Sequence, residues 1–266
     1  MSYQNLFKTL WDDYTRRNPH AKKVYDTFIA RGETVANDHI ALRTFNDPRV
    51  GVDKLGSIFE AYGYEEKGTY DFHAKKLFAK HYEHSDPAAP KVFISELLIG
   101  NFSHELQTSV KNCIDQIPLD TLTPEELINS ATSWQLSHAT YKKLLTESEY
   151  AAWLYAFGFC ANHFTVNVNA LHTFTDLADV NSFLKKNGFK LNAAGGEIKG
   201  TRQECLEQSS TLAEETTVKF SEGDKQIPSC YYEFAKRYPL PNGELYTGFI
   251  AASADKIFES TDVSNR

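Results

Sequence analysis

The sequence contains an internal repeat, and this repeat constrains the fold more than any other feature. An alternating segment, DHIALRTF, begins beside His39 and is followed by an apolar helical pattern that ends at Gly63. A second alternating segment, NHFTVNVN, contains His163 and is followed by a helical pattern that ends at Gly188. The two spacings nearly match, since 63 − 39 = 24 and 188 − 163 = 25. The recurrence predicts two copies of one supersecondary unit.

Both passages continue in the same way. Each helical pattern is followed by Lys-Gly-Thr, and each passage closes with a strand that holds one glutamate, Glu96 in KVFISELLIG and Glu233 in SCYYEFAKRY. By this symmetry Glu96 is the partner of Glu233. Each half sheet has a face that it cannot cover by itself, so two halves related by a pseudo-twofold axis can pair and enclose a shared cavity. The repeat therefore predicts an α+β protein with two strand–helix–strands modules.

Helical patterns flank and separate the modules. Before His39, apolar residues recur at helical spacing, and Thr123-Pro124-Glu125-Glu126 has the sequence of a helix start. We interpret 141–159 as a long amphipathic stretch and the acidic run ECLEQSSTLAEE as a solvated loop or short helix. We predict one compact domain over 1–266, composed of a helical lead-in (1–36), a first βαβββ module (37–100), a helical insertion (101–160), a second βαβββ module (161–255) and a C-terminal tail (256–266).

Composition excludes several classes of protein. The 28 Lys and Arg against 35 Asp and Glu give a formal charge of −7, which argues against binding to nucleic acid. No stretch approaches eighteen apolar residues, so we expect no membrane-spanning helix. The N-terminal segment lacks an apolar signal core, and the four cysteines are scattered without a C-x-x-C pair. We therefore expect a cytoplasmic protein without disulfides or a structural zinc site.

Four polar residues occupy strand positions where apolar ones are expected, namely His39, Glu96, His163 and Glu233. Glu233 stands among aromatic residues in the segment YYEF. Because desolvating an unpaired carboxylate is costly, a buried glutamate at this position needs a partner. A metal ion would meet that need.

Two histidines and one glutamate are a ligand set for a divalent transition metal. With three protein ligands the ion keeps open positions, and a facial set of two His and one carboxylate favours Fe(II) and O2 chemistry. Zn and Ni also bind such ligands and can replace Fe(II) in a purified sample. Arg43 lies on the same strand face as His39, since 43 − 39 = 4 is even, and its planar guanidinium suits a substrate carboxylate.

Each of these assignments has an ordinary structural alternative. A single strand histidine is more often hydrogen-bonded to the backbone than bound to metal, and Arg43 could pair with a structural acid. Glu233 could form an ion pair with Lys236 or Arg237. Glu96 is the most ambiguous residue, because it could be a fourth metal ligand, or it could contact the ligands or line the cavity without binding the metal. Four protein ligands would leave fewer open positions and favour proton chemistry over O2 activation.

DHIALRTF, with His39 and Arg43 at this spacing, resembles the signature of the 2-oxoadipate dioxygenase/decarboxylase family, also called hydroxyglutarate synthase. The segments NHFTVNVN, YYEFAKRY and GFIAASADKIFEST are similar to later parts of that family. The resemblance implies a vicinal oxygen chelate-like fold, whose paired βαβββ modules match the repeat. It also implies that His39, His163 and Glu233 bind Fe(II) and that Arg43 contacts a 2-oxo acid.

The chemistry implied by the resemblance consumes O2 and releases CO2 from the 2-oxo acid, and 2-oxoadipate would yield 2-hydroxyglutarate without a separate cosubstrate. Two alternatives stay open at this point. One is a glyoxalase-like isomerase or lyase that uses another divalent metal. The other is a small-molecule-binding protein that has the cavity without turnover.

Overall fold

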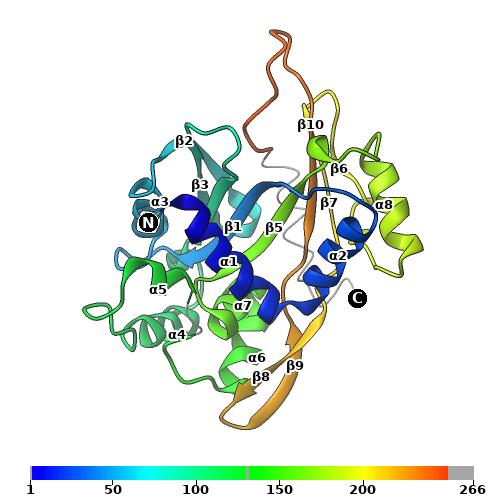
Figure 1. The fold of residues 1–266 in the computed structure, drawn as a ribbon. Coiled ribbons are helices and arrows are strands. Elements are labelled where there is room, and N and C mark those ends of the chain that lie inside the picture. Colours follow the sequence, from blue (N-terminus) through cyan, green and yellow to red (C-terminus); the bar gives the residue numbers. More distant parts are fainter. Residues whose placement is uncertain (1, 130–131, 251–266) are drawn as a thin grey trace. The chain divides into compact units, whose positions relative to one another are not determined.

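The computed structural model describes residues 2–129 and 132–250, which mix helices and strands (Figure 1). The chain divides into two units, each assembled from separate stretches of sequence. Unit 1 comprises Met1–Tyr14, Ala41–Asn162 and Glu215–Ile227. Unit 2 comprises Thr15–Ile40, His163–Glu214 and Pro228–Arg266. The predicted C-terminal tail, 256–266, lies outside the described residues, and the other predicted segment limits stay predictions.

The helices are α1 (Tyr3–Arg17), α2 (Pro19–Ala30), α3 (Val52–Glu60), α4 (His104–Ile114), α5 (Pro124–Asn129), α6 (His138–Glu147), α7 (Glu149–Phe157) and α8 (Leu177–Lys186). The strands are β1 (Asn37–Phe45), β2 (Tyr64–Phe72), β3 (Leu77–His84), β4 (Lys91–Leu97), β5 (Ala161–Asn167), β6 (Lys199–Thr201), β7 (Leu206–Ser210), β8 (Glu215–Phe220), β9 (Gly223–Pro228) and β10 (Glu233–Arg237). Within the described ranges, none of these helices combines the length and the apolar character that crossing a bilayer requires.

The first module forms the sheet of unit 1. Its strands follow the order β2-β3-β4-β1, and the β2–β3 and β3–β4 pairs are antiparallel. Helix α3, which connects β1 to β2, packs on β2, β3 and β4. The apolar side of α3 is buried there, and Phe59 lies against Phe7 and Tyr64.

The second module forms the sheet of unit 2 with the same topology. Its strands follow the order β5-β10-β7-β6, with β10 parallel to β5 and antiparallel to β7. Helix α8 connects β5 to β6 and packs beside β7 and β10 (Figure 1). Its Phe183 meets Phe28 of α2, and Phe28 also contacts Phe234 of β10. In both modules the last strand lies beside the first, so the predicted α+β fold with two βαβββ modules is confirmed.

Both helix ends predicted from glycine are confirmed. Gly63 and Gly188 have φ angles of +90° and +84°, the left-handed region in which a side chain would be strained. The backbone N–H groups of Gly188 and Phe189 donate to carbonyls in the last turn of α8, at 3.0 and 3.1 Å. The two modules thus share their stop signals as well as their topology.

Strands β7 and β9 are among those that the sequence pattern missed. The acidic run predicted as a solvated loop or short helix contains β7, whose residues 208–210 are buried between β10 and β6. Its polar residues are buried because they find partners, such as Asn181 for Ser209 at 2.7 Å. Strand β9 pairs with β8 as a separate hairpin inserted between β7 and β10.

The insertion between the modules is helical, as predicted. At the start of α5, the Thr123 N–H donates to Glu126 and the Glu126 N–H donates to Thr123 Oγ1, at 2.7 and 3.2 Å. The long amphipathic stretch predicted over 141–159 is divided at Ser148, which lies between α6 and α7. Every residue of α7 from Tyr150 to Phe157 is buried, so this helix has no solvent-facing side.

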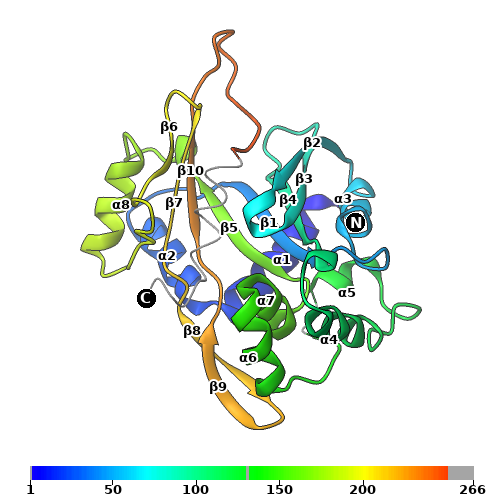
Figure 2. The same cartoon turned by 180° about the vertical axis from the view of Figure 1, so that it is seen from behind.

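The β8–β9 hairpin belongs to unit 1 and lies beside α6 (Figure 2). Its Glu222 carboxylate accepts hydrogen bonds from the N–H groups of His138 and Ala139, at 2.8 and 3.2 Å, and from the Ser137 hydroxyl. These bonds lower the pKa of Glu222 well below its usual range. The hairpin therefore supplies the first turn of α6 with an acceptor.

Close packing of α3 on the sheet generates a stability prediction. A Cβ atom on Gly56 would lie 2.1 Å from the Tyr82 hydroxyl oxygen. We expect Gly56→Ala to lower the free energy of unfolding by about 1–3 kcal/mol through overpacking, although alanine favours helix by about 1 kcal/mol. Ser57→Ala, on the exposed side of the same helix, is the control. Chemical denaturation of both variants checks the prediction, and a stabilised Gly56→Ala would contradict it.

Candidate metal centre

Three polar side chains converge in unit 2. His39 lies on β1 within the part that belongs to unit 2, His163 lies on β5, and Glu233 begins β10. Parallel pairing sets Glu233 opposite Thr165, two residues after His163 and on the same face. One ligand atom from each residue lies within 4.8 Å of the others. The structure thus brings together the three residues that the sequence analysis proposed as ligands.

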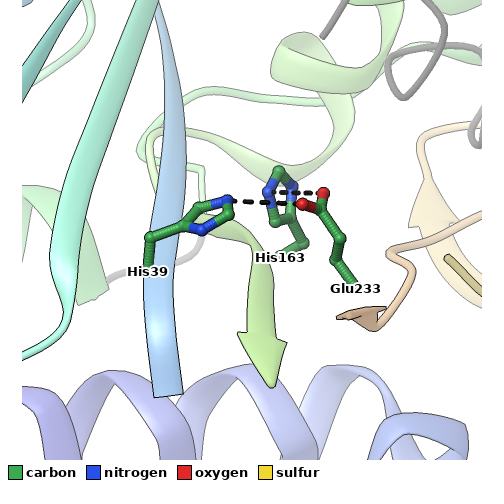
Figure 3. Close-up of side chains that lie close together, drawn as sticks. All are labelled: His39, His163 and Glu233. Atoms are coloured by element: carbon green, nitrogen blue, oxygen red, sulfur yellow. Dashed lines mark ion pairs between the residues drawn. The ribbon is translucent and has the colours of Figure 1, made fainter. Parts of the chain in front are cut away.

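The glutamate is the centre of this cluster (Figure 3). His39 Nε2 lies 3.4 Å from Glu233 Oε1, and His163 Nε2 lies 3.3 Å from Glu233 Oε2. The three side chains are 3, 6 and 1% exposed, in that order along the chain. Burial raises the pKa of Glu233 to about 8, although the Gln208 side-chain amide donates to Oε1 at 2.6 Å. The carboxylate is therefore costly to ionise unless a cation joins it.

The donor set fits a divalent transition metal. Two imidazole nitrogens and a carboxylate oxygen bind such ions at about 2.0–2.2 Å, so ligand atoms about 3–4 Å apart can share one ion. The alternative in which Glu233 pairs with Lys236 or Arg237 is wrong. Lys236 Nζ donates to the Thr175 carbonyl at 2.5 Å, and Arg237 pairs with Asp38.

Asp38 is a functional candidate that the sequence analysis missed. Its Oδ1 lies 2.7 Å from His39 Nδ1, and its carboxylate accepts from Arg237 Nε and Nη2 at 2.7 and 2.9 Å. Burial opposes ionisation, but the Arg237 guanidinium and the hydrogen bonds from His39 and Arg237 outweigh it and hold the pKa of Asp38 well below its usual range. The acid directly before His39 was the available signal, since metal-binding histidines usually donate their other N–H to such a group.

Aromatic rings enclose the two histidines. The Tyr231 ring stacks on His163 with centroids 4.7 Å apart, and the Phe249 ring meets the His39 ring edge-on at 4.8 Å. Thr165 Oγ1 lies 3.1 Å from His39 Nε2. The rings restrict the histidines to narrow ranges of orientation and keep water away from them, which strengthens electrostatic interactions at the cluster.

Arg43 lies in unit 1, in a slot formed by helix α7. Its guanidinium carbon is 4.8 Å from the Tyr150 ring centroid and 5.1 Å from the Trp153 centroid. Nη1 is 3.4 Å from Glu149 Oε1, and the Arg43 side chain is 1% exposed. A contact of 3.4 Å is long for a charge-assisted hydrogen bond, so Glu149 is a weak version of the structural acid considered above.

The Tyr150 hydroxyl fixes this slot to the sheet. It donates to the Ser95 carbonyl at 2.7 Å and lies 2.8 Å from Ser95 Oγ, and it accepts from the Thr44 N–H at 3.3 Å. Helix α7 is thereby tied to β1 beside Arg43 and to β4. The aromatic ring against the guanidinium is set by the backbone of two strands.

Glu96 is not the structural equivalent of Glu233. Glu96 Oε2 accepts from the Val52 N–H at 2.8 Å, so Glu96 faces helix α3 of its own module. In the second module Ser209 and Phe234 face the helices, and Glu233 points to the opposite face. Burial raises the pKa of Glu96, and the Val52 hydrogen bond partly offsets this. Within unit 1 Glu96 acts as an acceptor at the start of α3.

The family model for the 2-oxoadipate dioxygenase/decarboxylase family matches residues 2–246. The chain belongs to this family. The chloroplastic 2-oxoadipate dioxygenase/decarboxylase of Arabidopsis thaliana is 34% identical to this chain, and the match covers 93% of this chain and 74% of the plant protein. The family resemblance seen in DHIALRTF is thus confirmed over nearly the whole chain.

Two solved structures are similar to this member of the family. A hydroxyglutarate synthase from Oryza sativa, in complex with 2-oxoadipate, matches with a TM-score of 0.89 and 31% identity, covering 99% of this chain and 93% of the rice chain. A protein from Shewanella frigidimarina, named provisionally as a hydrolase, matches with a TM-score of 0.89 and 51% identity, covering 94% of this chain and 98% of the other.

The raised pKa of Glu233 generates a pH prediction for metal-free protein. A folded-state pKa of about 8 against 4.5 for an ordinary glutamate means that the unfolded chain ionises first as pH rises. The contribution of Glu233 to stability is therefore complete below pH 4.5 and is lost as pH rises to about 8. We expect Glu233→Gln to lack this loss, so that its melting temperature rises relative to the wild type between pH 5 and 8.

Thermal unfolding in the presence of a chelator measures this difference. Saturating Mn2+ should remove the decline in the wild type, because the ion compensates the carboxylate charge. A difference between the two proteins that stays constant across this pH range would show that the Glu233 carboxylate is already ionised in the metal-free fold.

Proposed function

We propose that this protein is an Fe(II)-dependent dioxygenase that decarboxylates a 2-oxo acid, and that 2-oxoadipate is converted to 2-hydroxyglutarate with release of CO2. The observation that carries the proposal is the buried Glu233 carboxylate in contact with His39 and His163, in a chain of this family. The rice relative with bound 2-oxoadipate supports the choice of substrate. The cytoplasmic location stays a prediction from the sequence.

Three side chains would hold the ion in this proposal. His39 and His163 offer Nε2 atoms, and Glu233 offers its carboxylate. When bound, Fe(II) would supply coordination sites for the 2-oxo acid and for O2. Three protein ligands leave such sites open, whereas a four-ligand set would favour the isomerase alternative. Within unit 1 Glu96 is occupied at the start of α3, which favours three ligands over four.

Arg43 would bind a carboxylate of the substrate. It lies four residues after His39 on β1, a spacing that corresponds to about 13 Å along a strand. The Tyr150 and Trp153 rings lie against its guanidinium. Its contact to the Glu149 carboxylate is 3.4 Å long, so this acid forms only a weak hydrogen bond with Arg43. A guanidinium held in this way loses little conformational entropy when a planar carboxylate arrives.

The stoichiometry defines the reaction. One 2-oxoadipate and one O2 give one 2-hydroxyglutarate and one CO2, so all carbon and oxygen atoms are accounted for and no second organic substrate is needed. In this reaction the protein would hold the ion, orient the 2-oxo acid and exclude bulk water from the His39–His163–Glu233 cluster. The Tyr231 and Phe249 rings serve the last purpose on the sides of the two histidines.

An oxygen electrode tests the proposal with Fe(II)-loaded protein and a panel of 2-oxo acids of increasing chain length. We expect equal amounts of O2 consumed and CO2 released, with 2-oxoadipate as the best substrate. His39→Ala should abolish turnover and metal binding, whereas His172→Ala, at an exposed position of unit 2, should leave both unchanged. Product formed under nitrogen would favour an isomerase or a hydrolase, and affinity without product would favour a binding protein.

Arg43 is tested by a change that keeps its charge. We expect Arg43→Lys to raise KM for the 2-oxo acid by roughly tenfold to a hundredfold with a smaller change in kcat, because lysine cannot form the two parallel hydrogen bonds of a guanidinium. Arg49→Lys is the control, since Arg49 is a half-buried residue of unit 1 that pairs with Asp47 and Asp115. An unchanged KM in Arg43→Lys would assign Arg43 a purely structural role.

A further inference from the structure

Asp38 joins two features of unit 2 that are otherwise separate. Its carboxylate contacts His39 Nδ1 on one side and the Arg237 guanidinium on the other, through contacts of 2.7, 2.7 and 2.9 Å. The Asp38 and Arg237 side chains are 4 and 6% exposed, so the ion pair is buried. Removing one partner of such a pair leaves an uncompensated charge, so each residue requires the other.

The contact from Asp38 decides which nitrogen of His39 carries the proton. An ionised carboxylate only accepts hydrogen bonds, so Nδ1 of the neutral ring must be the donor. Nε2 then presents its lone pair, and this atom is the one 3.4 Å from Glu233 Oε1. In the other tautomer Nε2 would carry a hydrogen and could not bind an ion.

The same guanidinium holds a segment near the end of the described chain. Arg237 Nη1 donates to the backbone carbonyls of Tyr246 and Gly248, at 3.1 and 2.8 Å. The next residue, Phe249, lies with its ring edge-on to His39 at 4.8 Å and is 6% exposed. Arg237 also lies over the Phe249 ring, with 5.3 Å between the guanidinium carbon and the ring centroid.

We propose that Asp38 and Arg237 are positioning residues that fix the metal-binding tautomer of His39 and tie residues 246–249 against it. The affinity for the metal and the position of residues 246–249 would then both depend on the buried Asp38–Arg237 ion pair. The proposal rests on the metal centre of the proposed function but not on the reaction, and its tests use metal-free protein and metal binding without substrate.

Asp38→Asn is the sharpest test of the tautomer. When the new amide oxygen takes the Oδ2 position, it still accepts from Arg237 Nε, and the NH2 group at the Oδ1 position donates to His39 Nδ1 and moves the ring proton to Nε2, while Arg237 Nη2 loses its acceptor on this side chain. We expect two-bond 1H–15N spectra of metal-free protein to show His39 as the Nδ1–H tautomer in the wild type and as the Nε2–H tautomer in the variant. We also expect Mn2+ to bind about 10- to 100-fold more weakly to the variant.

Arg237→Lys separates the two roles. Lysine can still pair with Asp38 but lacks the fork that reaches Asp38 and the two carbonyls together. Hydrogen exchange of the amides of residues 246–249 should become at least tenfold faster, while Mn2+ affinity falls less than in Asp38→Asn. Arg202→Lys is the control, because Arg202 is an exposed residue of unit 2 that lies over the Tyr238 ring.

Several results would overturn the proposal. An unchanged His39 tautomer in Asp38→Asn, or Mn2+ affinity within threefold of the wild type, would remove the role of Asp38. Wild-type exchange at residues 246–249 in Arg237→Lys would remove the anchoring role. If Asp38→Asn does not fold, Arg237→Lys decides the proposal by its exchange rates. Wild-type protein that binds Mn2+ as expected but consumes no O2 would contradict the proposed function and leave this inference intact.

Discussion

The desolvated carboxylate of Glu233 is the interaction on which the site depends. Unit 2 buries this group to 1% exposure and sets two imidazoles and one amide against it. Burial therefore favours the neutral form of Glu233, and a bound cation would favour the ionised form. A metal ion that binds here must displace the proton of Glu233, so its apparent affinity falls as the pH is lowered.

In each unit, hydrogen bonds set the orientation of a candidate site residue. Asp38 orients His39, and Arg237 in turn orients Asp38. In unit 1, the backbone of two strands orients Tyr150, and Tyr150 orients Arg43. The partner of Arg43 is thus held by the main chain, whereas the partner of His39 is held by another side chain.

The sequence predicted the parts of the fold that local pattern controls. Alternation identified β1 and β5, and Gly63 and Gly188 marked two helix ends, because each signal is contained in a few neighbouring residues. β7 was missed because its buried polar residues resemble a loop until β10 and α8 supply their partners. The symmetry between Glu96 and Glu233 was misleading for a related reason, since a shift of one residue along a strand reverses the face that a side chain occupies.

The candidate ligands were predictable because histidines and a glutamate at strand positions violate the expected apolar pattern. Their supporting residues were harder to find. Asp38 and Arg237 are 237 − 38 = 199 positions apart, and the sequence alone provides no measure of their proximity. Arg43 was found by its spacing from His39, whereas its aromatic slot comes from a helix more than a hundred residues later.

Each unit is assembled from separate stretches of the chain, and this limits where the coding sequence can be divided. His39 comes from a stretch that precedes most of unit 1, yet it joins His163 and Glu233 in unit 2, and the β8–β9 hairpin returns from the second module to unit 1. Splitting the coding sequence within the helical insertion would leave one fragment with His39 and the other with His163 and Glu233, so neither would hold all three candidate ligands. The two modules therefore cannot be separated into independent proteins without dividing the candidate ligands between them.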